Sequence, residues 1–154
     1  MKLKRILLAE DNPKDVELAL EALDEHNLAN DVVVVRDGAQ ALDYLYRRGE
    51  FGGRPEGNPA VVLLDLKMPK VDGMEVLRQI KTDDEMKVIP IVMLTSSREE
   101  QDLVKSYQLG ANAYVVKPID FQQVVGAIKQ LGLFWAVLNE APIGSVRQAN
   151  GKGS

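Results

Sequence analysis

Short, unbroken apolar runs recur along the chain and alternate with segments in which apolar residues are spaced as on one face of a helix. Such runs are typical of strands that are buried on both faces, as in parallel sheets. The five runs span residues 6–9, 32–35, 61–64, 89–94 and 113–116. The five helical segments span residues 13–26, 41–46, 74–80, 103–110 and 120–131. This alternation predicts an α/β fold, a five-stranded parallel sheet flanked by five helices.

One carboxylate directly follows an apolar run. Asp65 comes after the run at 61–64, where the predicted strand ends. An unpaired charge is costly inside a buried strand, whereas the carboxyl ends of strands are where open α/β sheets bind their ligands. Asp65 is therefore a candidate reactive group.

Polar side chains also follow three of the other runs. They are Glu10, Asp11, Thr95, Ser96 and Lys117. Because right-handed crossovers bring the carboxyl ends of parallel strands to one edge, we expect these groups to lie near Asp65. Clustered carboxylates repel each other unless a cation binds, and Mg²⁺ prefers oxygen ligands. With a lysine and a hydroxyl nearby, such a site can neutralise the oxygens of a phosphoryl group during transfer.

Composition narrows the class of protein. The 154 residues suggest one domain, and the net charge of −4 with a pI near 5.1 argues against a generally basic nucleic-acid surface. Without cysteine there is no disulfide, no cysteine-based zinc site and no cysteine nucleophile. The apolar stretch near the N-terminus is too short for a signal peptide, and no run is long enough to span a bilayer. We expect a cytoplasmic protein with no nucleic-acid or membrane partner.

Four motifs stand in order at the predicted strand ends. They are Leu-Ala-Glu-Asp-Asn at 8–12, Leu-Leu-Asp-Leu-Lys-Met-Pro at 63–69 with Asp-Gly-Met at 72–74, Leu-Thr-Ser at 94–96 and Tyr-Val-Val-Lys-Pro at 114–118. In this order and spacing the chain resembles the receiver domain of two-component response regulators. The resemblance covers residues 3–131 and implies a (βα)5, flavodoxin-like receiver fold.

The resemblance also implies a metal site and a nucleophile. Asp65 corresponds to the residue that accepts the phosphoryl group. Glu10, Asp11 and Asp65 correspond to side chains that bind Mg²⁺, and the backbone carbonyl of Lys67 completes the protein ligands. Lys67 and Ser97 border the path of attacking water in this family, so we expect both to affect the lifetime of the phosphoryl group.

Three further positions correspond to groups that respond to the phosphoryl group. Thr95 would hydrogen-bond to it and Lys117 would pair with it. Tyr114 holds the position of the switch aromatic, which moves inward as Thr95 closes on the phosphate. The resemblance also implies a cis peptide bond between Lys117 and Pro118, which is otherwise a minority state.

The implied function is signalling rather than turnover catalysis. A histidine kinase would donate its phosphoryl group to Asp65, and the domain would catalyse only this transfer and its own dephosphorylation. The added charge would then remodel the face formed by the fourth helix, fifth strand and fifth helix. We expect a receiver domain with a C-terminal helix extension at 1–138, a mobile tail at 139–154 and no output domain, hence a stand-alone regulator.

Two departures from a minimal receiver suggest a subgroup. One is a glycine- and proline-rich loop at 47–59, longer than the usual α/β connection of about 2–6 residues. The other is the apolar extension at 131–138, in which Phe134, Trp135 and Leu138 form a stripe. Both resemble the small regulators that partner cyanobacterial or bacterial phytochromes. The stripe either caps its own core or forms a homodimer through the last helix and strand, and we favour the dimer.

Three alternatives compete with this interpretation. A haloacid-dehalogenase-type, Mg²⁺-dependent phosphatase also uses an aspartate nucleophile, but it needs a second aspartate where this chain has Lys67. A flavodoxin-like electron carrier needs phosphate-binding loops, and the acidic segment at 10–13 would repel a phosphate. A degenerate receiver that no longer takes phosphate is disfavoured by the intact set of acids, hydroxyl and lysine.

Overall fold

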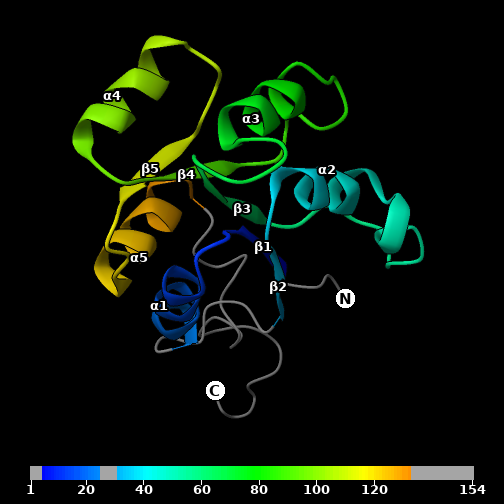
Figure 1. Cartoon of the computed structure of the whole chain (residues 1–154), viewed down its shortest axis with the longest axis horizontal. Coiled ribbons are helices and arrows are strands. Elements are labelled where there is room, and N and C mark those ends of the chain that lie inside the picture. Colours follow the sequence, from blue (N-terminus) through cyan, green and yellow to red (C-terminus); the bar gives the residue numbers. More distant parts are fainter. Residues whose placement is uncertain (1–4, 25–30, 133–154) are drawn as a thin grey trace, which may run out of the picture.

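The fold is a single parallel sheet with helices on both faces (Figure 1). The computed structural model describes residues 5–24 and 31–132. All neighbouring strands pair in parallel, in the order β2-β1-β3-β4-β5. The predicted α/β fold with five parallel strands is confirmed. The strands are β1 (Arg5–Ala9), β2 (Asp31–Val35), β3 (Val61–Asp65), β4 (Ile91–Thr95) and β5 (Ala113–Val116).

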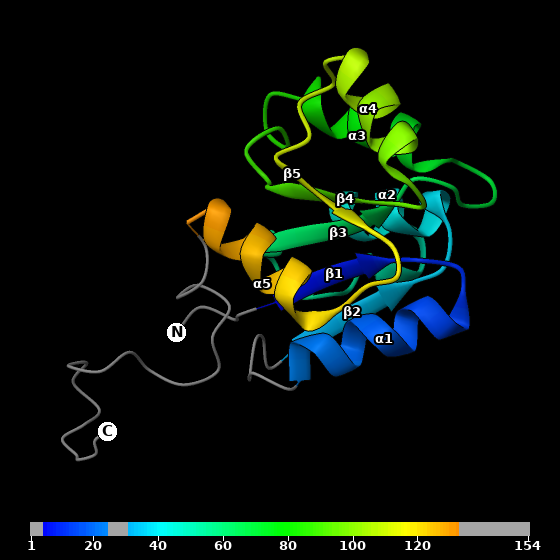
Figure 2. The same cartoon turned by 90° about the vertical axis from the view of Figure 1, so that its left-hand side faces the viewer.

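In the described ranges, four α-helices and one short 3-10 helix connect the strands, and a fifth α-helix follows β5. They are α1 (Pro13–Asp24), α2 (Gly38–Tyr46), η1 (Gly49–Phe51), α3 (Gly73–Lys81), α4 (Arg98–Ser106) and α5 (Phe121–Gln130). Helices α1 and α5 cover one face of the sheet, and α2, α3 and α4 cover the other (Figure 2). Successive strand residues therefore enter different cores: Ile6 and Leu8 pack toward α1 and α5, whereas Leu7 packs toward α2 and α3. This two-sided burial is why the strands lack polar alternation. None of the helices in the described ranges is long and apolar enough to cross a membrane.

Each α-helix begins at a side chain that caps it. The side chains of the N-cap residues accept hydrogen bonds from backbone N–H groups of the first turn, as short polar residues do at this position. For α1, Asn12 Oδ1 accepts from the N–H groups of Lys14 and Asp15 at 2.8 and 3.2 Å, just before Pro13 in the first position of the helix. The caps of the other four helices are Asp37, Asp72, Ser97 and Asp120.

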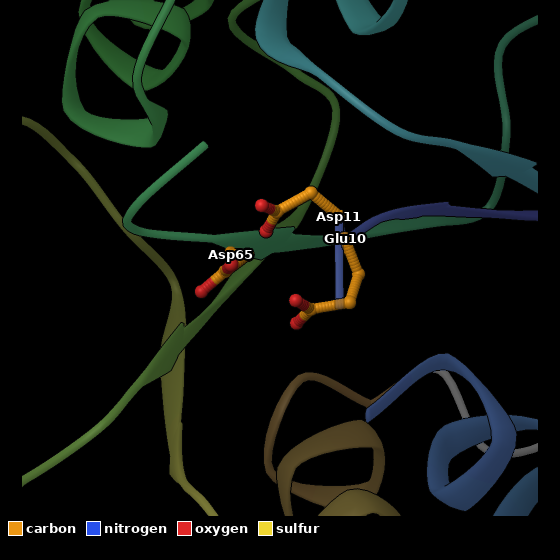
Figure 3. Close-up of side chains that lie close together, drawn as sticks. All are labelled: Glu10, Asp11 and Asp65. Carbon is orange, nitrogen blue, oxygen red and sulfur yellow. The ribbon is translucent and has the colours of Figure 1, made fainter. Parts of the chain in front are cut away.

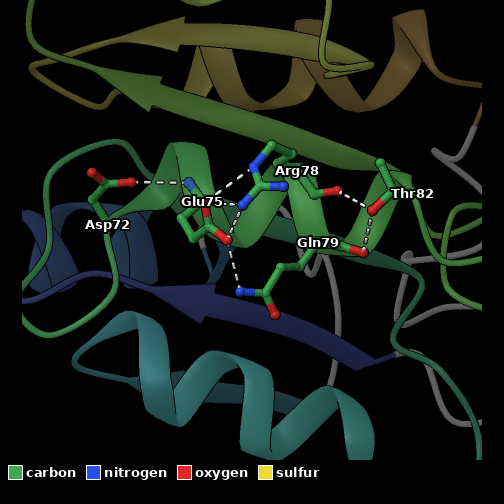
Figure 4. A network of polar contacts seen from close by, with 5 residues as sticks. All are labelled: Asp72, Glu75, Arg78, Gln79 and Thr82. Atoms are coloured by element: carbon green, nitrogen blue, oxygen red, sulfur yellow. Dashed lines mark hydrogen bonds and ion pairs between the residues drawn. The ribbon is translucent and has the colours of Figure 1, made fainter.

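Helix α3 carries a continuous polar network on its exposed side (Figure 4). Asp72 caps the N–H of Glu75, whose carboxylate pairs with Arg78 and Gln79. Thr82 Oγ1 closes the far end by donating to the Arg78 carbonyl at 2.8 Å. Pairs at three- and four-residue spacing on an exposed helix face are weakly stabilising. They hold the outer face of α3 while its inner face packs on the sheet.

The long loop at 47–59 is tied to the end of α2 rather than extended into solvent. It contains η1, and Arg54 lies over the ring of Tyr44 with 4.2 Å between the guanidinium carbon and the ring centroid. Arg54 also donates to the Tyr44 carbonyl at 2.7 Å and to the Leu45 carbonyl at 3.4 Å. These are last-turn carbonyls that have no partner within the helix, so the cation satisfies them.

Several predicted boundaries shift by a few residues, such as the start of α2 at Gly38 instead of 41 and that of α4 at Arg98 instead of 103. The fourth strand was expected at 89–94 but starts at Ile91 and includes Thr95. Pro90 lies just outside it because proline has no N–H for the ladder, although its carbonyl accepts from Val62 N–H at 3.0 Å. Helix α4 ends at Ser106, before the predicted end at Gly110. The apolar extension with Phe134, Trp135 and Leu138, and the tail at 139–154, lie outside the described residues.

The strand order places a crevice at the end of β1 and β3. From β1 the chain turns to α1 on one face, and from β3 it turns to α3 on the opposite face. Neighbouring strands whose connections diverge in this way leave a crevice at their carboxyl ends, where open α/β sheets bind ligands.

Gly73 fixes the loop that follows β3, and its substitution tests this constraint. A Cβ at Gly73 would lie 2.1 Å from the carbonyl oxygen of Asp65, whereas a Cβ at Gly126 in α5 would meet nothing within 4 Å. We expect Gly73→Ala to lower the free energy of unfolding by about 1–3 kcal/mol through overpacking. The matched control, Gly126→Ala, should raise it by about 0.5–1 kcal/mol because alanine favours a helix interior. Urea unfolding measures both, and equal effects would contradict the constraint.

Candidate functional site

Three carboxylates gather in the crevice between β1 and β3 (Figure 3). Glu10 and Asp11 directly follow β1, and Asp65 is the last residue of β3. One carboxylate oxygen from each lies within 4.8 Å of the others. Glu10 is fully buried and Asp65 is 4% exposed, whereas Asp11 is exposed. This set of oxygen donors, open to solvent through Asp11, suits a hard divalent cation such as Mg²⁺.

Lys117 is the cation of this site. Its Nζ lies 2.9 Å from Glu10 Oε1, 3.0 Å from Asp15 Oδ2 and 3.1 Å from Asp65 Oδ1. Lys117 follows β5, and its backbone N–H donates to the Thr95 carbonyl at 2.7 Å. This hydrogen bond fixes the loop after β5 beside β4. The peptide bond to Pro118 is cis, as predicted. Glu10 Oε1 makes no aligned hydrogen bond in the described part of the chain, so its contact with Lys117 is mainly electrostatic.

Thr95 ends the strand next to that of Asp65 and carries a hydroxyl without a partner in the described part of the chain. Thr95 ends β4, is fully buried, and its Oγ1 makes no hydrogen bond to the residues that the structure describes. Buried hydroxyl groups nearly always have a hydrogen-bond partner. An orphaned hydroxyl at the carboxyl edge of the sheet is therefore a donor available to a ligand.

The charges shift the pKa values of both central groups. Burial, and next the negative charge of Glu10, raise the pKa of Asp65 to about 7, although Lys117 opposes this shift. Burial alone would lower the pKa of Lys117, but the neighbouring carboxylates of Glu10, Asp15 and Asp65 outweigh it, so its pKa lies above the ordinary value. Lys117 thus stays protonated, whereas Asp65 ionises at a higher pH than an ordinary aspartate unless a further cation binds.

Lys67 reaches toward α4 instead of Asp65. Its Nζ lies 2.9 Å from Glu100 Oε2, and the other oxygen of Glu100 accepts from the Ser96 N–H at 2.7 Å. Ser97 Oγ in turn accepts from the Glu100 N–H at 3.1 Å, as in a capping box. The side chains at the two positions expected to border the water path are therefore joined through Glu100.

Tyr114 lies half-buried in β5, on the face of the sheet that α4 covers. Its ring centroid is 5.1 Å from Lys105 Nζ on α4, a cation–π contact. Burial raises the pKa of its hydroxyl. The predicted switch residue thus contacts helix α4 rather than the carboxylates.

Asp15 is the one residue at this site that the sequence analysis did not select. It stands in the first turn of α1, four residues after Asp11. The four-residue spacing of Asp11 and Asp15 places both acids on one side of the helix start. An acid in the first turn of a helix is common, however, because it interacts favourably with the helix dipole, so this spacing does not single out Asp15. Nothing in the local pattern indicates that Lys117, a hundred residues away, is its partner.

The comparison with protein families decides the class of protein. The model of the response regulator receiver domain matches residues 6–129. The chain belongs to the response regulator receiver family. Rcp1, a response regulator of Synechocystis sp., is 37% identical over 132 residues, or 86% of this chain and 88% of Rcp1. FilR2, a probable methanogenesis regulatory protein of Methanothrix harundinacea, is 40% identical over 137 residues, or 89% of this chain and 86% of FilR2.

Solved structures place the chain near regulators of phytochromes. The bacteriophytochrome response regulator RtBRR matches with a TM-score of 0.85 and 63% identity, covering 95% of this chain and 88% of RtBRR. The phosphorylated cyanobacterial phytochrome response regulator RcpA gives 0.71 and 41%, covering 87% and 94%. The Mn²⁺-bound form of Rcp1 gives 0.70 and 36%, covering 90% and 99%. This receiver domain is thus related to phytochrome response regulators, and the haloacid-dehalogenase alternative finds no support.

The raised pKa of Asp65 predicts a pH-dependent stability. Between pH 3.8, its ordinary pKa, and about 7, the folded protein holds more protons than the unfolded chain, so stability falls as pH rises. We expect metal-free Asp65→Asn to be more stable than the unchanged protein by about 2 kcal/mol at pH 7.5, with the gain fading toward pH 4. Urea unfolding in EDTA at several pH values measures this difference.

The control for this measurement is Glu17→Gln, which removes one exposed charge from α1 outside the site. It should show little pH-dependent change. Mg²⁺ should raise the stability of the unchanged protein more than that of Asp65→Asn, because binding to the folded state stabilises it. A difference that stays constant from pH 4 to 8 would contradict the raised pKa.

Proposed function

We propose that this receiver domain accepts a phosphoryl group on Asp65 from the phosphohistidine of a histidine kinase. The observation that carries the proposal is the pairing of Asp65 with Lys117, with the orphaned hydroxyl of Thr95 at the end of the neighbouring strand. A nucleophile, a cation and a hydroxyl donor thus stand at the same edge of the sheet. That arrangement fits an anionic group that arrives on Asp65.

The chemistry is an in-line displacement. An Asp65 oxygen attacks the phosphorus, an acyl phosphate forms, and the bond between phosphorus and the histidine nitrogen breaks. Lys117 pairs with the phosphoryl oxygens, and Thr95 Oγ1 donates its hydrogen bond to one of them. The backbone N–H of Lys117 donates to the Thr95 carbonyl, so the backbones of these two residues are held together before the phosphoryl donor arrives.

The acidic cluster would hold Mg²⁺. The carboxylates of Glu10, Asp11 and Asp65 supply three oxygens, and the Lys67 backbone carbonyl is the fourth ligand that the resemblance implies. When bound, the cation neutralises part of the charge on the phosphoryl oxygens. Support comes from the oxygen-only donor set and from Rcp1, which has been seen with Mn²⁺.

Phosphorylation would act through Thr95 and Tyr114. Closing of the Thr95 hydroxyl on the phosphoryl group moves the end of β4, and α4 begins three residues later at Arg98. Tyr114 contacts Lys105 of that helix, so a shift of α4 changes the space open to the ring. The face formed by α4, β5 and α5 would then present a different surface to partners.

The donor that we propose is a phytochrome-linked histidine kinase, and the place of action is the cytoplasm. Support for the donor comes from RtBRR and RcpA, which are phytochrome response regulators. We also propose that the domain signals through altered protein contacts of its own. The homodimer through the last helix and strand stays a prediction, because Phe134, Trp135 and Leu138 lie outside the described residues.

Phosphotransfer from kinases tests the core assignment. A panel of radiolabelled histidine kinases that includes a bacteriophytochrome kinase should label the protein in the presence of Mg²⁺. Asp65→Asn should take up no label, because the amide is not a nucleophile. Glu17→Gln should be labelled as the unchanged protein is. Label on Asp65→Asn would contradict the assignment of the nucleophile, and equal transfer from every kinase would contradict the phytochrome link.

The Lys67–Glu100 pair predicts how fast the phosphoryl group is lost. Glu100→Gln releases the Lys67 ammonium, which can then reach the phosphoryl group and shield it, so decay should slow about fivefold, or about 1 kcal/mol. Lys67→Ala opens the path for water and should speed decay by a similar factor, while leaving the backbone carbonyl in place. Decay of labelled phosphoprotein measures both rates.

The double variant and a neighbouring acid control this prediction. Glu100→Gln combined with Lys67→Ala should decay as Lys67→Ala alone, because Glu100 acts through the lysine. Glu99→Gln changes an exposed acid in the same first turn and should have no effect. Slower decay in the double variant than in Lys67→Ala would show that Glu100 acts by another route.

A further inference from the structure

Asp15 is a third carboxylate partner of Lys117 and stands in α1, whereas the other two partners stand at strand ends. Its Oδ2 lies 3.0 Å from Lys117 Nζ, between the distances to Glu10 and Asp65, 2.9 and 3.1 Å. Three carboxylates therefore surround the ammonium, and an incoming phosphoryl group has to compete with them for Lys117.

The simpler role for Asp15 is to favour the start of α1. An acid in the first turn interacts well with the helix dipole. That role needs no contact outside the helix, and Asn12 already satisfies the N–H groups of the first turn. The contact with Lys117 is therefore a separate feature, made across the crevice from α1 to the loop after β5.

The three partners differ in how easily they can give up the ammonium. Glu10 is fully buried, and the side chain of Asp65 is 6% exposed, so neither can regain water. The side chain of Asp15 is 18% exposed and lies at the rim. A carboxylate that can be rehydrated loses an ion pair at the lowest cost.

We propose that Asp15 competes with an incoming phosphoryl group for Lys117. It pairs with the ammonium in the resting protein and gives up that ion pair when a phosphoryl group reaches Asp65. The inference rests on the proposed function of Asp65. Its consequence is that the charge of Asp15 opposes the approach of an anionic phosphoryl donor.

Removal of the Asp15 charge should therefore make the site bind a phosphoryl donor more tightly. In Asp15→Asn the ammonium keeps Glu10 and Asp65, and the donor no longer has to displace a third carboxylate. With phosphoramidate as the donor and saturating Mg²⁺, we expect the half-saturating donor concentration to fall about fivefold. The maximal rate should change by less than about twofold, because two buried carboxylates still aim Lys117.

The experiment measures phosphoprotein by intact mass at a series of phosphoramidate concentrations. Asp15→Glu restores the carboxylate and should return the half-saturating concentration to within about twofold of the original. Glu17→Gln makes the same change of charge on the exposed side of α1 and should leave it unchanged. A purely structural role for Asp15 would lower stability or the maximal rate without tightening donor binding.

The outcomes separate this inference from the proposed function. An unchanged half-saturating concentration in Asp15→Asn, or an equal fall in Glu17→Gln, overturns the role of Asp15 while labelling of Asp65 still stands. If the unchanged protein takes up no phosphoryl group, the proposed function itself is overturned. Should Asp15→Asn fail to fold, Asp15→Ala removes the same charge with a better helix former and carries the same expectation.

Discussion

The site depends on the ammonium of Lys117 among carboxylates at one edge of the sheet. Without it, Glu10 and Asp65 would be two buried acids in contact, and one of them would have to take up a proton. With it, the cluster is still net negative, which keeps the crevice ready for a second cation. The parallel sheet makes this possible, because it brings the ends of β1, β3 and β5 together while the backbone of each strand stays hydrogen-bonded.

Much of the fold and part of the site could be predicted from the sequence. The strands are buried on both faces, so they appear in the sequence as unbroken apolar runs with clear ends. Three site residues stand at such ends: Glu10, Asp65 and Lys117. A parallel sheet brings these strand ends to one edge, so the position of the three residues follows from the fold. The receiver fold and family were therefore recognisable before any coordinates.

Contacts between side chains of distant elements could not be predicted. The Asp15–Lys117 pair and the Lys67–Glu100 pair depend on how α1 and α4 sit against the sheet, and no local pattern encodes that geometry. The loop at 47–59 was expected as an ordinary long loop because its glycines and prolines signal turns. Its anchoring by Arg54 depends on the last-turn carbonyls of Tyr44 and Leu45 in α2, which are not visible in the residues of the loop.

The loop at 47–59 can also change in sequence without affecting the site. It joins α2 to the amino end of β3, so it lies at the opposite edge of the sheet from Asp65. Gly53 at its tip is exposed, and an added Cβ there would meet nothing within 4 Å. A peptide tag or a small reporter domain can therefore be inserted at Gly53 without changing the edge of the sheet that carries Asp65. Gly53 is thus a suitable place to attach a sensor.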